Sequence, residues 1–267
     1  MYLASVGGPS SRGDLETDAV WLERLKSLNN ALAATGEPLE GNLFYGHHQR
    51  NFASRPPHPM FKAKRDRLVL VVAGRKRLLE IGVNGGHSAY LALSSNTDLE
   101  FHGVDICANR YVREGISWLQ TEYPGRVHLH AGDSRQVVES LATTGLRFDI
   151  FHIDGAKYRY FGDVVNCHRL LADGECLALI DDADRPDVTR TLRRCRSRGL
   201  IEPTPEFPPM PRTENHRNEI VRMKPLSPSL YRTLLTYDSA VQFTERVRFK
   251  AKVIRRDLTK RKTTKGI

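Results

Sequence analysis

A hydrophobic run that ends in a glycine-rich turn most constrains what this 267-residue chain can fold into. Residues 78–88 read LLEIGVNGGHS. Glycines in such a turn let the backbone approach a ligand closely, and the helix that follows offers free N–H groups. The pattern therefore predicts the first strand of a Rossmann-like sheet, turning into a helix.

The spacing of the turn and its acid indicate which ligand it would hold. Gly82-x-x-Gly85-Gly86 differs from the G-x-G-x-x-G of dinucleotide binders. Glu80 disfavours an anionic pyrophosphate and favours a cationic or zwitterionic ligand. S-adenosylmethionine fits these charges, since it carries an ammonium, a sulfonium and no phosphate. An ordinary strand–turn–helix without a ligand is the alternative.

Four further segments read as strands that end in polar residues, at 101–105, 127–134, 148–154 and 175–182. Their polar ends are Asp105, Asp133, Ser134, Asp154, Asp181 and Asp182. Ligands of open α/β sheets bind at the carboxyl edge, where such ends meet. A single acid at a strand end commonly caps a helix, but repeated acids in chain order favour a binding site.

Residues 78–186 resemble class I S-adenosylmethionine-dependent methyltransferases, and most of all the metal-dependent O-methyltransferases of the catechol and caffeoyl-CoA type. The motifs are the 80–88 turn, Asp154-x-x-Lys157-x-x-Tyr160, and Asp181-Asp182, where the family has Asp-Asn. Asp at position 182 also occurs in related sugar O-methyltransferases, and Ala156 replaces an Asp of the nearest relatives. The resemblance implies a Rossmann-like methyltransferase fold, an α/β structure whose mostly parallel seven-stranded sheet carries helices on both faces.

The polar strand ends and the resemblance together predict the residues that bind S-adenosylmethionine. These are Glu80, Gly82, Asn84, Gly86, Ser88, Asp105, Asp133, Ser134 and Asp154. Asp105 lies nineteen residues after Gly86, where this fold class holds ribose hydroxyls. We expect Asp133 to lie beside the adenine.

Asp154, Asp181 and Asp182 offer hard oxygen ligands for a divalent cation, of which magnesium is the one expected. Such a cation would lower the pKa of an acceptor hydroxyl and orient it. Three carboxylates this close predict at least one raised pKa in the metal-free site. The alternative for Asp181-Asp182 is a helix cap before Arg185-Pro186.

Lys157 and Asp154 are the predicted catalytic residues. Lys157 lies three residues beyond Asp154, and near a metal its pKa is expected to fall far enough for it to act as a base. The alternative for Lys157 is an ordinary solvent-exposed lysine without a catalytic role. Metal-free transfer, with Asp154 or His48 as the base, is the competing mechanism.

The positive charge is concentrated at the C-terminus. Residues 246–265 hold ten Lys and Arg against one acid, so they carry +9 of the formal net charge of +10. Apolar residues at helical spacing predict a basic amphipathic helix there. Such a helix can dock on its own domain, on an anionic membrane surface or on nucleic acid.

The chain divides into an N-terminal helix and lid (1–59), a methyltransferase domain (60–226) and a basic helical extension (227–267). Residues 14–34 are expected to be helical, with an apolar face of Val20, Leu22, Leu25, Leu28 and Leu32. Residues 36–59 are expected to be irregular and to cover the pocket. Residues 203–218 are rich in proline and form a second candidate substrate loop.

The sequence predicts an enzyme that methylates a hydroxyl of a small molecule or sugar. A nucleic-acid methyltransferase and a non-catalytic S-adenosylmethionine-binding module remain alternatives. We find no signal peptide, no apolar stretch long enough to span a bilayer and no C-x-x-C pair among the four cysteines. These absences predict a cytoplasmic protein, peripheral to a membrane if the tail binds one. A homodimer also stays open.

Overall fold

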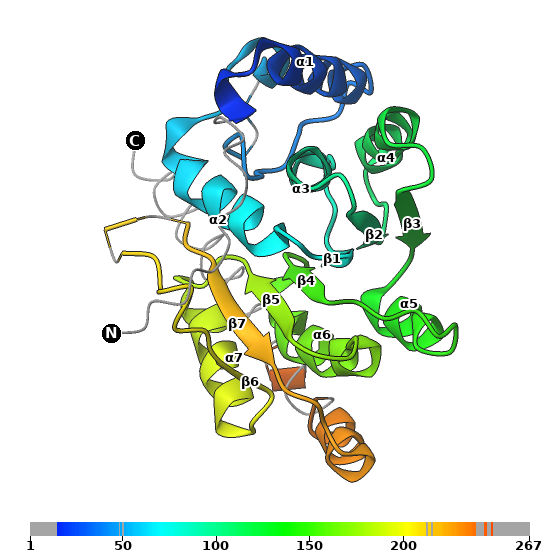
Figure 1. The fold of residues 1–267 in the computed structure, drawn as a ribbon, viewed down its shortest axis with the longest axis vertical. Coiled ribbons are helices and arrows are strands. Elements are labelled where there is room, and N and C mark those ends of the chain that lie inside the picture. Colours follow the sequence, from blue (N-terminus) through cyan, green and yellow to red (C-terminus); the bar gives the residue numbers. More distant parts are fainter. Residues whose placement is uncertain are drawn as a thin grey trace, which may run out of the picture.

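A seven-stranded sheet forms the centre of the protein (Figure 1), with strand order β3-β2-β1-β4-β5-β7-β6. The computed structural model describes residues 15–47, 49, 51–211, 213–214, 216–238, 243–244 and 247. The strands are β1 (Arg77–Ile81), β2 (Glu100–Asp105), β3 (Val127–Ala131), β4 (Ile150–Ile153), β5 (Cys176–Ile180), β6 (Ile201–Pro203) and β7 (Glu219–Met223).

Strands β1 to β5 are parallel, and β7 runs antiparallel to both β5 and β6. This confirms the predicted fold class, and the five strands expected before residue 186 begin and end within about three residues of their predicted positions. The short strand β6 was not predicted, because three residues ending in a proline carry little pattern.

Helices cover both faces of the sheet (Figure 1). One face carries α1 (Ala19–Ala33), α2 (Lys62–Val72), α3 (His87–Ser95) and α4 (Arg110–Glu122). The other carries α5 (Ser134–Leu141), α6 (Tyr160–Cys167) and α7 (Pro186–Ser197). Short 3₁₀ helices occur at Leu15–Thr17, Phe52–Ser54, Pro59–Phe61, Lys157–Arg159 and His168–Leu170.

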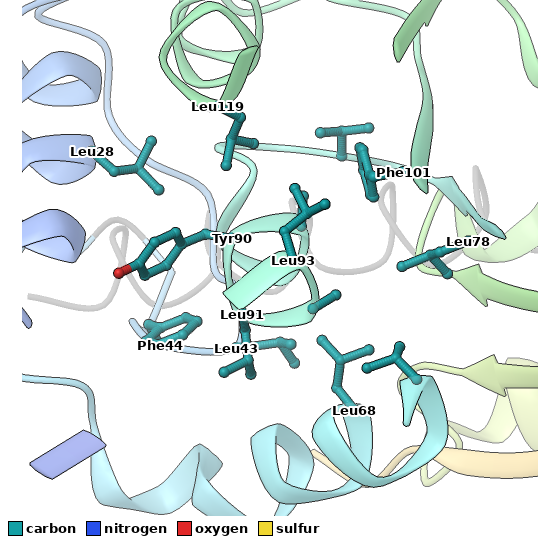
Figure 2. Close-up of a cluster of buried hydrophobic side chains, with 14 of the residues drawn as sticks. Leu28, Leu43, Phe44, Leu68, Leu78, Tyr90, Leu91, Leu93, Phe101 and Leu119 are labelled. Carbon is teal, nitrogen blue, oxygen red and sulfur yellow. The ribbon is translucent and has the colours of Figure 1, made fainter. Parts of the chain in front are cut away.

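The buried side chains form two hydrophobic cores, a first core on the α1–α4 face of the sheet and a second on the α5–α7 face. Figure 2 shows how the first core is built around α3. Tyr90 and Leu93 of α3 pack among Leu28 of α1, Leu68 of α2 and Leu119 of α4. Buried aliphatic side chains of this size each contribute roughly 1.5–3 kcal/mol. The packing holds α1, which precedes the strands of the sheet in the sequence, against the helices that cover the sheet.

The predicted apolar face of α1 is wrong at its first position, where Trp21 and not Val20 is buried. Val20 is 63% exposed, while Trp21 is 4% exposed and stacks on Tyr90. Asp18 caps the helix by accepting from the backbone N–H groups of Val20 and Trp21. This cap fixes the helical phase, so that Trp21, Leu25, Leu28 and Leu32 face inward.

The segment between α1 and α2 is irregular, as predicted, but much of it is packed. Leu43, Phe44 and Tyr45 are buried. The guanidinium of Arg65, itself 1% exposed, donates to the carbonyl oxygens of Leu43 and His58 and pairs with Glu16. One buried cation on α2 therefore holds the lid segment, residues 36–59, at its middle and at its C-terminal end.

Residues 228–238 form a helix whose Leu234 is buried against the second core. The basic helix predicted for residues 246–265 lies outside the described residues, apart from Val247. Within the described part of the chain, no helix is both long and apolar enough to cross a membrane.

Candidate functional site

A cavity of about 1350 Å³ opens at the carboxyl edge of the sheet, under the lid. Most of the predicted site residues line it: Gly82, Asn84, Asp105, Asp133, Ser134, Asp154, Lys157, Asp181 and Asp182. Glu80, Gly86 and Ser88 lie behind this surface. The structure therefore brings the ends of five strands to one site, as the sequence predicted.

Gly82 is required where β1 meets the cavity. Its φ is +91°, and a Cβ added there would lie 2.7 Å from the backbone oxygen of Asp154. Any larger residue would push β1 away from β4 and close the edge on which a ligand rests. Gly86, with φ of +78°, then begins α3.

Glu80 supports the glycine turn from behind. Its Oε1 accepts from Ser88 Oγ at 2.5 Å and lies 2.6 Å from Nδ1 of His152 on β4. Burial raises the pKa of Glu80, against the opposing effects of His152 and Ser88. Ser88 thus contacts Glu80, and Glu80 in turn contacts β4, so both side chains are engaged behind the cavity surface, and their direct contact with a ligand stays a prediction.

Asp105 organises the same turn from β2. Its Oδ2 accepts from the backbone N–H of Val83 at 2.9 Å and of Asn84 at 3.2 Å, and its Oδ1 accepts from Cys107 N at 2.7 Å. Oδ1 accepts only one of these bonds and has a second lone pair, so Asp105 can still accept from a ribose hydroxyl.

Asn84 joins the turn to the lid. Its Nδ2 donates to the backbone oxygen of Gly41 at 3.1 Å. Its φ of 54° lies in the left-handed region, which asparagine tolerates better than most residues. The turn and the lid are therefore directly connected across the mouth of the cavity.

Asp133 and Ser134 begin α5 and are already engaged by the protein. Both oxygens of Asp133 accept from Arg159, and Asp133 also caps α5 through Arg135 N at 3.0 Å. The hydrogen bonds from Arg159, opposed by burial, hold the pKa of Asp133 well below its usual range. Ser134 Oγ donates to Asp163 Oδ1 at 2.7 Å.

Three acids and two lysines meet at the ends of β4 and β5. Lys157 Nζ lies 2.8 Å from Asp154 Oδ1 and 3.1 Å from Asp182 Oδ2. Lys64 Nζ, from α2, lies 2.6 Å from Asp181 Oδ2, and both side chains are buried. Two ammonium groups thus offset two of the three carboxylates and leave one negative charge.

The pKa values follow from this crowding. Burial, together with the carboxylates of Asp154 and Asp182 and opposed by Lys64, raises the pKa of Asp181 to about 6. The predicted raised carboxyl pKa is therefore confirmed. Burial disfavours the ammonium of Lys157, but Asp154 and its neighbours raise the Lys157 pKa above its usual value. The lowered pKa expected for Lys157 is wrong for this arrangement, because acids surround it.

The donor set of these acids fits a hard divalent cation in its chemistry. Asp181 Oδ1 is buried and has no hydrogen-bond partner among the described residues. Asp182 adopts φ of 52°, a conformation that suits Asn or Asp. The acids are still spread out, and they are not among the described residue groups whose ligand atoms all lie within 4.8 Å of one another.

The helix-cap alternative for Asp181-Asp182 is wrong. α7 begins at Pro186, and Arg185 occupies the N-cap position. His48, the alternative base, lies outside the described residues, whereas His47 and His58 of the lid line the cavity.

Sequence reasoning missed three residues of the site. Lys64 was not singled out, although it shares a helical face with Leu68 and the buried Val71, a spacing that predicts burial. His152 and Arg159 were passed over because their partners, Glu80 and Asp133, lie far away in the sequence.

Comparison with known proteins shows which domain and which fold this chain resembles. Residues 79–183 match a family described as a methyltransferase domain. Among solved structures, an O-methyltransferase from Bacillus cereus in complex with S-adenosylhomocysteine superposes with a TM-score of 0.58 at 15% identity, covering 75% of this chain and 90% of that one. TomG from Streptomyces achromogenes, an O-methyltransferase of tomaymycin synthesis in complex with S-adenosylmethionine, gives 0.55 at 17% identity, covering 76% and 90%. No curated protein matches the sequence significantly.

Residues 79–183, which are less than half of the chain, thus match a methyltransferase domain, and the chain shares its fold with solved O-methyltransferases. The glycine turn and Asp105 line the cavity at the carboxyl edge of the sheet, where open α/β sheets bind their ligands, so their placement fits S-adenosylmethionine.

Proposed function

We propose that this enzyme methylates a hydroxyl oxygen of a small polar molecule or sugar, with a divalent cation, magnesium by preference, held by Asp154, Asp181 and Asp182. The observation that carries the proposal is the cluster of these acids with Lys157 in the same cavity as the glycine turn. The O-methyltransferases that share its fold support oxygen as the acceptor atom.

For the cofactor, we propose the predicted set of residues, with different roles. Gly82, Asn84, Asp105, Asp133, Ser134 and Asp154 line the cavity and are placed to touch it. Glu80, Gly86 and Ser88 hold the turn in shape from behind. The backbone of the turn, preorganised by Asp105, would meet the methyl donor without rearranging.

A divalent cation at the acids would supply positive charge that lowers the pKa of the acceptor hydroxyl and orients its oxygen. Lys157 keeps its own proton while Asp154 and Asp182 face its ammonium. It therefore holds the acids in place at rest, and it could act as a base only after those carboxylates are engaged elsewhere and its own proton has passed to solvent.

Polar side chains on the lid side of the cavity support a polar acceptor, although Tyr45, Met60 and Phe61 also line that side. His47, Gln49, Arg55 and His58 line the cavity from the lid, and Arg185 lines it from the other side. These side chains offer hydrogen-bond donors to several hydroxyls at once. A polyhydroxylated, sugar-like acceptor is the class that we favour.

Metal-free transfer is the second candidate, and one observation favours it. Lys64 and Lys157 already neutralise two acids with short ion pairs, as a cation would. In this mechanism Asp154 would take the proton, and the two ammonium groups would supply the positive field.

Transfer of a labelled methyl group from S-adenosylmethionine to a panel of phenols and sugars, with magnesium or with excess chelator, tests the proposal. We expect chelation to abolish turnover while S-adenosylhomocysteine binding persists. Asp181→Ala should lose turnover, whereas the conservative Asp182→Asn should retain most of it. Full turnover in excess chelator would establish the metal-free mechanism instead.

A further inference from the structure

A second cluster of metal-ligating side chains lies at the other end of the sheet. Glu100 and His102 on β2 and His128 on β3 present one ligand atom each, all within 4.8 Å of one another. In the parallel register, His102 stands directly opposite His128, so both project from the same face. His102 comes three residues before Asp105, which places the cluster roughly 10 Å from the cavity edge along the strand.

The distances within the cluster suit a zinc ion. Glu100 Oε1 lies 3.0 Å from His102 Nε2 and 3.1 Å from His128 Nε2. Zinc holds nitrogen and oxygen ligands at about 2.0–2.2 Å, so neighbouring ligand atoms of a tetrahedral site lie about 3.3–3.5 Å apart. A shift of a few tenths of an ångström would therefore admit the ion.

The hydrogen bonds around the cluster leave one histidine nitrogen available to a cation. His128 Nε2 is buried and makes no hydrogen bond among the described residues, despite facing a carboxylate oxygen. In contrast, the other oxygen of Glu100 accepts from Arg77 Nε at 2.6 Å, which fixes the direction of Oε1. Glu100 can thus offer a single oriented oxygen to a metal.

A fourth residue, His130, orients the ring of His102. His130 Nε2 lies 2.9 Å from His102 Nδ1, and the two rings are within 8° of parallel. Metal-binding histidines usually engage their second ring nitrogen in such a contact, which fixes the orientation of the ring. Phe148 packs edge-on against His102, with ring centroids 5.0 Å apart.

We propose that Glu100, His102 and His128 form a zinc site that clamps β3 to β2, with His130 as the residue that positions His102. Imidazole nitrogens select zinc over magnesium, which prefers the all-oxygen set of the cavity. β3 is an edge strand, and the side chain of His128 is 40% exposed, so an ion can reach the site from solvent. Three protein ligands leave the fourth position to water.

Calorimetric titration of the metal-free full-length protein with zinc chloride, in excess magnesium, tests this proposal. We expect one zinc ion to bind, and His128→Gln to weaken its binding at least about 10-fold. His130→Gln should weaken it less. Asp182→Asn, a matched change in the cavity, should leave it unaltered. An unchanged zinc affinity in His128→Gln would overturn the proposal.

Zinc-edge X-ray absorption of the wild-type protein provides a second readout that needs no variant. Imidazole rings give a distinctive outer-shell scattering pattern, which we expect to see from two histidines. A spectrum with only oxygen ligands would place the zinc elsewhere and refute the site. Neither result depends on the methyl acceptor or on turnover.

Discussion

Asp163 on α6 should make the stability of this protein fall as the pH rises. The side chain is 2% exposed, its Oδ1 accepts from Ser134, and its Oδ2 has no hydrogen-bond partner among the described residues. Burial, with Asp238 nearby and opposed by Ser134 and Arg159, raises the pKa of Asp163 from 3.8 to about 7. Folding therefore favours its protonated form.

The size of the effect follows from this pKa. An acid whose pKa is raised on folding contributes its full share to the free energy of unfolding when the pH is below its pKa in the unfolded chain. That contribution is lost as the pH rises through its pKa in the folded protein. For a shift from 3.8 to about 7, the free energy of unfolding falls by about 2 kcal/mol at pH 5 and by about 4 kcal/mol at pH 8, relative to its value at a pH below 3.8. An asparagine at this position would retain the acceptor for Ser134 without this cost.

Equilibrium urea denaturation at pH 5 and pH 8 measures the difference. We expect Asp163→Asn to gain stability over the wild type by about 2–3 kcal/mol more at pH 8 than at pH 5. Asp173→Asn, a change at an acid outside the core, is the control and should show no such difference. An equal effect of Asp163→Asn at both pH values would refute the reasoning.

Three further predictions concern the site and the tail. Gly82→Ala should destabilise the protein by about 1–3 kcal/mol in urea denaturation and weaken S-adenosylhomocysteine binding, because the added Cβ would meet the backbone of Asp154. Gly174 has a similar positive φ but open space around it, so Gly174→Ala is the control. An equal loss of stability in Gly174→Ala would disprove the role of the contact with Asp154. Lys157→Ala should lower kcat at least about 10-fold while leaving cofactor affinity within about 3-fold, and a loss confined to cofactor binding would exclude a catalytic role. Removing residues 255–267 should leave cofactor affinity intact in calorimetry and reduce binding to anionic vesicles, most clearly at low salt; a truncated enzyme that cannot bind cofactor would show that the tail belongs to the folded domain.

The parts of the fold that follow from local pattern were predictable from the sequence. Each parallel strand is a short apolar run that ends in a turn residue, and the acids at 105, 154, 181 and 182 mark one edge because parallel strands share their direction. The phase of α1 was not predictable in the same way, because Val20 and Trp21 are both apolar and the Asp18 cap decides between them.

The site was predictable as a set of positions but not as a set of contacts. Lys64 neutralises Asp181 from a helix 117 residues away in the sequence, and that pairing exists only after the sheet and α2 have packed. The same long-range packing turned Glu80 toward His152 and Asp133 toward Arg159. Charge partners of this kind can outweigh the effect of burial on a pKa. Burial alone would lower the pKa of Lys157, but the neighbouring acids raise it.

Binding of S-adenosylhomocysteine to the wild type and to Asp105→Ala, measured by calorimetry, tests the central claim most directly. Asp105 lines the cavity and holds the glycine turn through two backbone N–H groups, so we expect its loss to weaken binding by roughly 10- to 100-fold. Asp98→Ala, at an exposed acid, should bind as the wild type does. Equal affinity in Asp105→Ala and the wild type would contradict the proposed cofactor site.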